Sequence, residues 1–360
     1  MKVLITGAAG FIGYHLSKRM IEKNIDVVGL DNLNDYYSVN LKYERLNLLG
    51  IEKNGMNSLD VLNQSKTFSN FSFIKCDLSD QAGMEKLFNE HQFDVVINLA
   101  AQAGVRYSLE NPHAYTSSNV TGFLNILEGC RHHKIKHLIF ASSSSVYGAN
   151  QKMPFEVSDR TDHPVSLYAA TKKSNELMAH TYAHLYGIPC TGLRFFTVYG
   201  PLGRPDMAYF KFANLISEGK PIDVYNHGKM ARDFTYIDDI VEGIIRLVPK
   251  VPKGFSENGS ARRNPDDEFQ PLVSANYQIF NIGNGTPVNL LDFIEILEEQ
   301  LGLKTSHNMM TMQPGDVVKT WADVSDLYKY IQYKPKVNIQ EGITRFVEWY
   351  HAYYGNLQKS

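Results

Sequence analysis

A tyrosine, a lysine and a run of serines in the middle of the chain have the chemistry needed to oxidise an alcohol. Tyr168 and Lys172 are four residues apart in a stretch, 165–186, that we predict to be one long helix, so both side chains lie on one helical face. A phenol has a reference pKa of about 10 and becomes a base at neutral pH only where positive charge favours the phenolate. Lys172 would supply such a charge, as would a cationic cofactor bound beside the phenol. A tyrosine and a lysine at this spacing also occur by chance on surface helices.

The serines at 142–145 give the pair its support. They close a predicted strand, and hydroxyls at the carboxyl edge of a parallel sheet can hydrogen-bond a reacting substrate oxygen and the phenol together. The alternative interpretation is that they are ordinary residues of a serine-rich turn.

A glycine-rich segment near the N-terminus has the spacing of a cofactor loop. Gly7, Gly10 and Gly13 lie between a predicted strand and a predicted helix that begins at Phe11. A dinucleotide pyrophosphate needs this close backbone approach and the free N–H groups of a helix start. A purely structural glycine turn is the alternative, and Asp31 argues against it. At the end of the second strand its carboxylate can accept hydrogen bonds from the adenosine ribose and would repel a 2′-phosphate, which favours NAD over NADP.

Short apolar strands alternate with amphipathic helices through the first half of the chain, which is typical of α/β proteins with a parallel sheet covered on both faces. We therefore predict a Rossmann-type doubly wound parallel sheet, with a smaller mixed α/β substrate-binding region after it. The predicted strands are Val3–Thr6, Val27–Leu30, Ser72–Lys75, Val95–Asn98, His137–Ser142 and Cys190–Phe195. The first predicted helix begins at Phe11, and the others cover 40–48, 111–131, 165–186 and 207–217.

The alternation breaks after Phe196, which we take as the main domain boundary. We predict an NAD-binding domain at 1–196, to which about 235–250 and 277–284 return, and a substrate-binding domain that takes up most of 197–360. Residues 249–276 are rich in Lys, Gly, Ser, Asn, Pro and Asp and predict an exposed loop.

Composition excludes several classes of protein. The 360 residues carry 36 Lys and Arg against 38 Asp and Glu, a net charge of −2 that offers no field for nucleic acid or an anionic membrane. The three cysteines form no Cys-x-x-Cys pair, so we expect no disulfide framework, no metal site and a reducing, cytoplasmic location. The apolar start of the chain could be a weak secretory signal, but its glycines interrupt it, and no apolar stretch approaches the roughly 20 residues that cross a bilayer.

Several motifs together resemble one family. They are the stretches Thr6 to Gly13, Asp31 to Tyr37, Asn98 to Ser108, Ser142 to Gly148, Tyr168 to Lys172 and Arg194 to Ala208. The chain resembles, over nearly its whole length, the extended short-chain dehydrogenases/reductases that epimerise nucleotide sugars, and most closely the UDP-glucuronate 4-epimerases. The resemblance implies bound NAD, a UDP-sugar held mainly by residues 197–360, and a homodimer formed through the helices near 111–131 and 165–186.

The resemblance also implies a role for each matching residue. Ser143, Tyr168 and Lys172 form the catalytic triad. The cofactor is bound by Gly7, Gly10, Phe11, Ile12, Gly13, Asp31, Asn32, Asp77, Leu78, Leu99, Ala100, Ala101, Tyr168, Lys172 and Phe195. The substrate is bound by Ser143, Ser144, Ser145, Thr197, Arg204, Arg232 and Asp316, with Arg232 on the diphosphate and Asp316 on the uridine ribose. One departure is Gln313, which stands where UDP-galactose epimerases carry an arginine.

The resemblance implies 4-epimerisation of UDP-glucuronate to UDP-galacturonate through a transient 4-keto sugar. That keto group would be beta to the C6 carboxylate, an arrangement that loses carbon dioxide unless the carboxylate is held out of alignment. We expect Arg204 to hold it through a planar charge-assisted fork, with Ser144, Ser145 and Thr197 as hydroxyl partners. The alternative for Arg204 is a loop cap, or an ion pair with Asp206 in solvent.

Other activities remain open. UDP-glucose or UDP-N-acetylhexosamine (uronate) 4-epimerases share the fold, although UDP-glucose epimerases usually carry Asn where Thr197 stands. A UDP-glucuronate decarboxylase would be expected to carry an acid near Ser143, and 142–145 contains none. From a different class, the chain could be a non-catalytic NAD-sensing binding protein.

Overall fold

A large parallel sheet forms the centre of the molecule. The computed structural model describes residues 1–53, 61–253, 276–312 and 318–357. The strands of this sheet follow the order β11-β7-β6-β5-β1-β2-β4-β3, and all neighbouring pairs are parallel except β3 with β4. They are β1 (Lys2–Thr6), β2 (Asp26–Asp31), β3 (Leu62–Gln64), β4 (Phe71–Lys75), β5 (Val95–Asn98), β6 (His137–Ser143), β7 (Cys190–Phe195) and β11 (Tyr277–Ile282).

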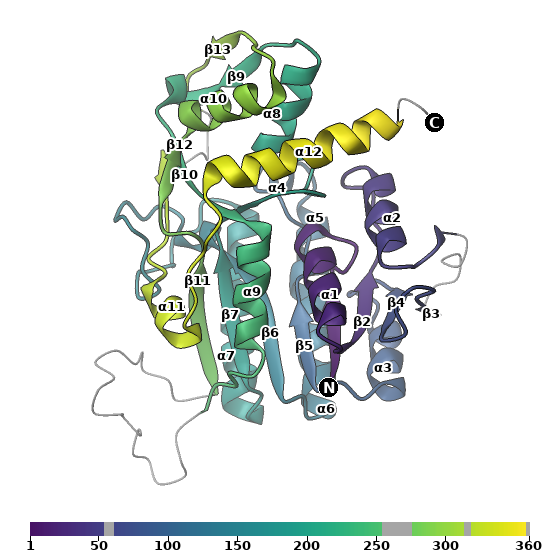
Figure 1. Cartoon of the computed structure of the whole chain (residues 1–360). Helices are drawn as coiled ribbons and strands as arrows, with labels where there is room; N and C mark the ends of the chain where they lie inside the picture. The colour runs from purple at the N-terminus through teal and green to yellow at the C-terminus, as the bar shows by residue number, and fades with distance from the viewer. Residues whose placement is uncertain (54–60, 254–275, 313–317, 358–360) are drawn as a thin grey trace.

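The strand order reverses at β1. From β1 the chain builds outward to β2 and β4 on one side, and then to β5, β6 and β7 on the other (Figure 1). A crevice at the carboxyl ends of the strands is expected at such a reversal, and it is where open α/β sheets bind ligands. The fold is thus the Rossmann-type doubly wound sheet that the sequence predicts.

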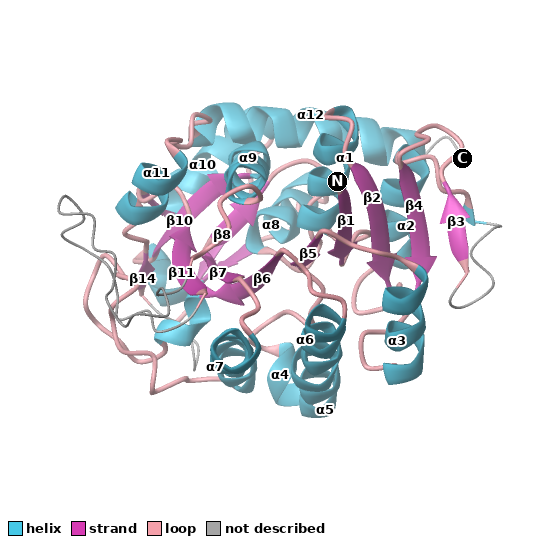
Figure 2. Cartoon of the chain, turned by 90° about the horizontal axis from the view of Figure 1, so that it is seen from below, coloured by secondary structure: helices cyan, strands magenta, loops and turns pink. Residues whose placement is uncertain are grey.

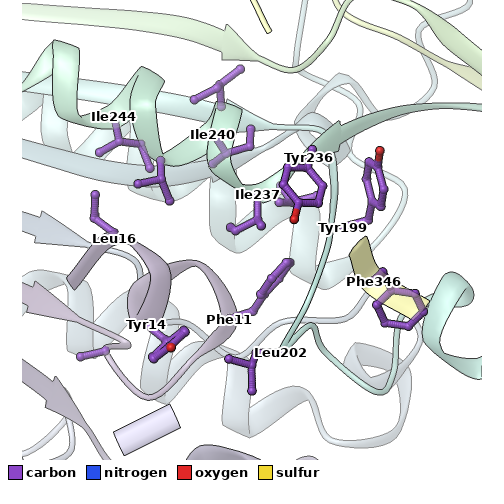
Figure 3. Packing of buried hydrophobic residues seen from close by; sticks show 14 of the residues in the cluster. Phe11, Tyr14, Leu16, Tyr199, Leu202, Tyr236, Ile237, Ile240, Ile244 and Phe346 are labelled. Carbon is purple, nitrogen blue, oxygen red and sulfur yellow. The ribbon is translucent and has the colours of Figure 1, made fainter. Parts of the chain in front are cut away.

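Helices cover both faces of this sheet, and each face has its own core (Figure 2). Successive residues of a strand point to opposite faces, so Val3 and Ile5 pack with α1 (Phe11–Glu22) and α9 (Ile237–Leu247), while Leu4 packs on the other side. Figure 3 shows the first core where Phe11 and Leu16 meet Ile237, Ile240 and Ile244. The opposite face carries α3 (Gln81–Glu90), α6 (Gly122–His132) and α7 (Leu167–Tyr186).

Smaller sheets lie beyond the carboxyl ends of the large one. Strand β10 (Ala231–Tyr236) pairs with β8 (Thr197–Tyr199), β12 (Pro287–Asn289) and β14 (Lys319–Thr320), and β9 (Ile222–Val224) pairs with β13 (His307–Met309). The chain crosses between these sheets and the large one several times. Between β10 and β12 in sequence come α9, which packs on one face of the large sheet, and β11, which is one of its strands. The remaining helices here are α8 (Ala208–Ser217), α10 (Leu290–Leu301), α11 (Ser325–Ile331) and α12 (Ile339–Leu357).

Local sequence explains where the helices begin and end. The predicted helix at 165–186 begins at Leu167 because the Ser166 hydroxyl caps it by accepting from the amide of Ala169, and it ends at Gly187, whose φ of +68° favours glycine. Helix α2 (Val39–Leu48) matches the helix predicted at 40–48, and α8 the one at 207–217.

The helix predicted at 111–131 differs from the expectation. It consists of α5 (Pro112–Tyr115), a π-helical turn at Thr116–Thr121 and α6, with α4 (Tyr107–Glu110) before it. Asn119, inside the π turn, donates to the carbonyl of Gln102 and to the Thr171 hydroxyl, both at 3.0 Å. The irregular turn therefore ties this segment to the helix that carries Tyr168. Short 3-10 turns follow β6 at Ser144–Tyr147 and β9 at Tyr225–Gly228.

None of the helices that the structure describes is long and apolar enough to span a membrane. Likewise, no group of three or more His, Cys, Asp or Glu side chains in the described ranges is arranged to hold a metal ion.

Candidate active site

A cavity of about 920 Å³ opens at the carboxyl ends of the central strands. It is bordered by the large sheet on one side and by residues of β8, α8 and β10 on the other. Its walls contain all the predicted site residues that the structure describes: Gly7, Gly10, Phe11, Ile12, Gly13, Asp31, Asn32, Asp77, Leu78, Leu99, Ala100, Ala101, Ser143, Ser144, Ser145, Tyr168, Lys172, Phe195, Thr197, Arg204 and Arg232. Asp316 and Gln313 lie outside the described residues. Residues far apart in sequence are thus brought to one space.

The glycine-rich turn leaves the start of α1 ready for an anion. Gly7 has a φ of +72°, and a Cβ on Gly13 would come within 2.0 Å of the carbonyl oxygen of Gly7, so glycine is required at both positions. Gly10 caps α1 without a side-chain hydrogen bond, and no acid lies in the first turn. The helix therefore presents uncapped N–H groups and an unneutralised positive dipole end, which suit a dinucleotide pyrophosphate.

Two acids lie where the adenosine half of a dinucleotide would bind. Asp31 ends β2, accepts from the amide of Leu33 at 2.8 Å and lies 3.5 Å from the ammonium of Lys42. Asn32 donates to Asp77 at 2.7 Å. Burial raises the pKa of Asp77, but the hydrogen bonds from Asn32 and Ser79 outweigh it and lower the pKa overall. Both side chains fit the role of acceptors for ribose or adenine groups, so the residues present suit NAD.

The three predicted catalytic side chains meet at the sheet end of the cavity. Burial raises the pKa of Tyr168, while a hydrogen bond with Ser143 and the charge of Arg204 act in the opposite direction. Lys172 donates to the carbonyl of Ala141 at 2.9 Å, and burial lowers its pKa to about 8. The sequence predicts Lys172 as the cationic neighbour of the phenol; in the structure, the charged side chains that shift the Tyr168 pKa are Arg204 and Asp206.

The serines divide into two groups. Ser143 donates to the Ser145 hydroxyl and accepts from the Ser145 amide, both at 3.1 Å, so these two lie together beside the phenol. Ser142 instead donates to Glu176 at 2.7 Å. Glu176 is buried and accepts two hydrogen bonds from Arg194, at 2.8 and 3.0 Å. The buried Glu176–Arg194 ion pair therefore holds the carboxyl end of β6 in place through Ser142.

Arg204 forms an ion pair inside the cavity. Its Nε donates to Asp206 Oδ1 at 3.0 Å and its Nη2 to Oδ2 at 2.5 Å, while Tyr36 donates to the same carboxylate at 3.2 Å. The Arg204–Asp206 ion pair is the alternative given for Arg204 in the sequence analysis, but it does not lie in solvent. Only 25% of the Arg204 side chain is exposed, and both residues line the cavity. Burial raises the pKa of Asp206, but the charge and hydrogen bonds of Arg204 and the hydrogen bond from Tyr36 together outweigh it, so the pKa is lowered and the carboxylate is ionised.

The far end of the cavity is polar. Arg232 on β10 lines it and donates to the carbonyl of Val318 at 3.2 Å. Further lining residues that the sequence did not single out are Lys42, Lys211, Asp223, Tyr225 and Thr320. Asp206 and Tyr36 each lie within a quoted motif, but only the fold brings these two residues, 170 positions apart, into contact.

Comparisons with known proteins agree on one family. A family model described as the NAD dependent epimerase/dehydratase family matches residues 3–258. Protein CapI of Staphylococcus aureus is 54% identical over 98% of this chain and 99% of its own length. A probable UDP-glucuronate 4-epimerase of Rhizobium meliloti is 48% identical over 98% of both chains. The crystal structure of UDP-glucuronic acid 4-epimerase from Bacillus cereus with UDP-glucuronic acid and NAD superposes with a TM-score of 0.81 at 32% identity, covering 98% of this chain and 100% of that one.

Proposed function

The chain belongs to the NAD dependent epimerase/dehydratase family, and from this premise we propose that it interconverts UDP-glucuronate and UDP-galacturonate by inverting C4 of the sugar, with NAD bound. One observation carries the proposal. A single cavity joins an uncapped glycine-rich helix start, a Tyr168–Ser143 pair and an arginine, Arg204. The Nε and Nη2 of Arg204 are paired with Asp206, so the proposed site for the sugar carboxylate is the other edge of the guanidinium.

The cofactor half is assigned to the turn from Gly7 to Gly13, with Asp31, Asn32, Asp77, Leu78, Leu99, Ala100, Ala101 and Phe195 around it. NAD, when bound, supplies a hydride acceptor and donor for C4 and a positive charge that lowers the pKa of Tyr168. The glycine turn holds the pyrophosphate on main-chain N–H groups, and Asp31 accepts from the ribose hydroxyls.

Tyr168 is the proposed acid and base. Its phenolate takes the proton of the 4-hydroxyl as C4 is oxidised to a ketone, and returns that proton after the sugar has turned over. Ser143 orients the oxygen through the hydrogen bond that it shares with the phenol. Lys172 is held in place by its hydrogen bond to the carbonyl of Ala141. Its pKa of about 8 allows it to pass on a proton near neutral pH.

The 4-keto sugar would be a β-keto acid, and its carboxylate must be kept out of alignment with the ketone. Arg204, Ser144, Ser145 and Thr197 are the proposed carboxylate partners, and Arg232 with Asp316 the partners of the UDP end. Asp206 is ionised beside Arg204 and cannot serve as a proton donor there. These features favour epimerisation over decarboxylation.

The experiment is product analysis by NMR with the purified, NAD-loaded protein. UDP-glucuronate should give UDP-galacturonate, and UDP-glucose and the UDP-N-acetylhexosamines should react more slowly. A UDP-pentose as the main product would establish the decarboxylase instead. Tyr168→Phe should still bind UDP-glucuronate, and its turnover should be about 10²–10⁴-fold lower than that of wild type. Wild-type turnover in that variant would revive a non-catalytic, NAD-sensing role or another chemistry.

We also propose that two copies pair through α6 and α7. Exposed leucines support this: Leu124 on α6 and Leu177 and Leu185 on α7 have 39%, 59% and 61% of their surface accessible. Large apolar side chains exposed together on neighbouring helices are typical of a protein interface.

The wider assignment has three parts. Residues 1–196, with 235–250 and 277–284, are assigned to the cofactor and most of 197–360 to the UDP-sugar. The cysteines Cys76, Cys130 and Cys190 are free and buried, which supports a reducing, cytoplasmic location. UDP-galacturonate is an activated sugar acid, so glycosyl transfer, as in polysaccharide synthesis, is the class of reaction that would consume it.

A further inference from the structure

A fully buried arginine lies between the cofactor turn and the loop that carries Arg204. Arg45 is on α2 and has no accessible surface. All five of its guanidinium N–H groups donate to neutral oxygens, namely those of Ala9, Tyr37, Leu202 (twice) and Gly203. A buried charge is costly unless its hydrogen bonds are satisfied, so this residue is held in a fixed geometry by its five partners.

These partners come from three segments that each contribute residues to the cavity wall, among them Gly10, Tyr37 and Arg204. The carbonyl of Ala9, at 2.8 Å, belongs to the glycine-rich turn that opens α1. The Tyr37 hydroxyl, at 2.7 Å, belongs to the residue that follows Tyr36 in the chain, and Tyr36 donates to Asp206. The carbonyls of Leu202 and Gly203 directly precede Arg204. One guanidinium therefore joins the cofactor turn to the segment that sets the position of Arg204.

The loop before Arg204 needs such support. Leu202 has a φ of +55°, in the left-handed region that disfavours residues with a Cβ. Two N–H groups of Arg45 converge on its carbonyl, at 3.1 and 2.7 Å. The Leu202 side chain is buried in the same cluster as Phe11 and Tyr14 (Figure 3). Strained residues persist where their surroundings hold them, and they concentrate at functional sites.

We propose that Arg45 is a positioning residue that keeps the 202–204 loop in register with the cofactor turn and thereby aims Arg204 at the sugar carboxylate. This rests on the proposed function. None of the five hydrogen bonds of Arg45 goes to the proposed UDP end of the cavity, around Arg232 on β10. Loss of Arg45 should therefore weaken the grip on the sugar acid and spare the grip on UDP.

Replacing Arg45 by lysine distinguishes the positioning role of the guanidinium from the effect of its positive charge. Arg45→Lys keeps the charge but replaces a planar fork of five donors by a point charge with three, which cannot replace five hydrogen bonds to four oxygens. In the NAD-loaded protein we expect the KM for UDP-glucuronate to rise about tenfold and the Kd of UDP itself to change less than twofold. The share of decarboxylated UDP-pentose in the product should rise, because a loosely held carboxylate can align with the ketone.

Two controls exclude a general loss of stability. Arg131→Lys repeats the substitution on the surface of α6, and Leu87→Ala weakens the core on the opposite face of the sheet. Both should keep the wild-type KM and product ratio. A product shift in Leu87→Ala, an equal weakening of UDP and UDP-glucuronate in Arg45→Lys, or wild-type behaviour in a folded Arg45→Lys would each overturn the proposal.

A milder variant decides the matter if Arg45→Lys does not fold. Tyr37→Phe removes one acceptor of Arg45 and should give a smaller shift in the same direction; an unchanged KM and product ratio would then refute the positioning role. If the wild-type protein does not epimerise UDP-glucuronate, the proposed function fails by itself. The comparison of UDP with UDP-glucuronate binding still tests Arg45.

Discussion

Replacing the buried glutamate behind the serines should cost far more stability than the same change on the surface. Glu176 accepts two hydrogen bonds from Arg194, one from Ser142 and one from Lys173, at 2.7–3.2 Å. Glu176→Gln keeps the shape but removes the charge, which leaves the Arg194 cation buried without its counterion. Breaking a buried pair costs about 3–5 kcal/mol. The amide oxygen can still accept one of the two Arg194 hydrogen bonds, so we expect a loss of about 3 kcal/mol, at the lower end of this range.

Glu128→Gln is the matched control, because Glu128 also pairs with an arginine, Arg131, but both side chains are more than a third exposed. Such a surface pair is worth about 0–1 kcal/mol. The assay is urea unfolding of both variants and wild type, followed by fluorescence, with the midpoints compared at equal slope. Equal midpoints for the two variants would refute the reasoning that burial makes the difference.

The difference should also depend on pH. Burial raises the pKa of Glu176, but Arg194, Lys173 and Ser142 outweigh it, so the folded pKa is below that of the unfolded chain. Stability from this group is therefore complete above the unfolded pKa of about 4.3 and is lost as the pH falls through the folded value. The advantage of wild type over Glu176→Gln should shrink below about pH 5. An advantage that grew with acid would contradict this sign.

Three further changes test other parts of the site. Asp31→Asn removes the charge at the end of β2 and should weaken NAD binding while reducing the preference for NAD over NADP, measured by fluorescence titration of both; an unchanged ratio would remove Asp31 from cofactor choice. Gly13→Ala places a Cβ 2.0 Å from the carbonyl of Gly7 and should abolish retention of NAD during purification, and full retention would contradict the close approach. Leu177→Glu places a charge in the proposed interface and should yield monomers in light scattering with the fold intact by circular dichroism, whereas an unaltered mass would exclude this helix from the contact.

The residues that we propose for the cofactor could be singled out from sequence because their signals are local. The glycine turn, Asp31 and the Tyr168–Lys172 spacing each lie within one strand, turn or helix, where periodicity and backbone requirements are strong. The strands predicted from apolar runs, such as Val95–Asn98, coincide with those of the structure for the same reason.

The sugar half could be predicted less well because its contacts are long-range. Asp206 meets Tyr36 across 170 positions, and Arg45 meets Leu202 across 157. A buried arginine on a polar-looking helix gives no pattern by which sequence could distinguish it from a surface one. The strands β8, β9, β12, β13 and β14 have only two or three residues each, too few for a period to be recognised, so the sequence predicts a mixed α/β region here but not its strand pairing.

The repeated passage of the chain between its sheets limits how such an enzyme can be altered. Because α9 and β11 lie between β10 and β12 in sequence, no contiguous segment among the described residues forms the proposed sugar-facing wall alone. A new sugar preference therefore cannot be obtained by replacing one contiguous segment of the chain with that of a relative. It has to come from substitutions scattered along the wall, each tolerated by the layer it shares with the nucleotide-carrying strands.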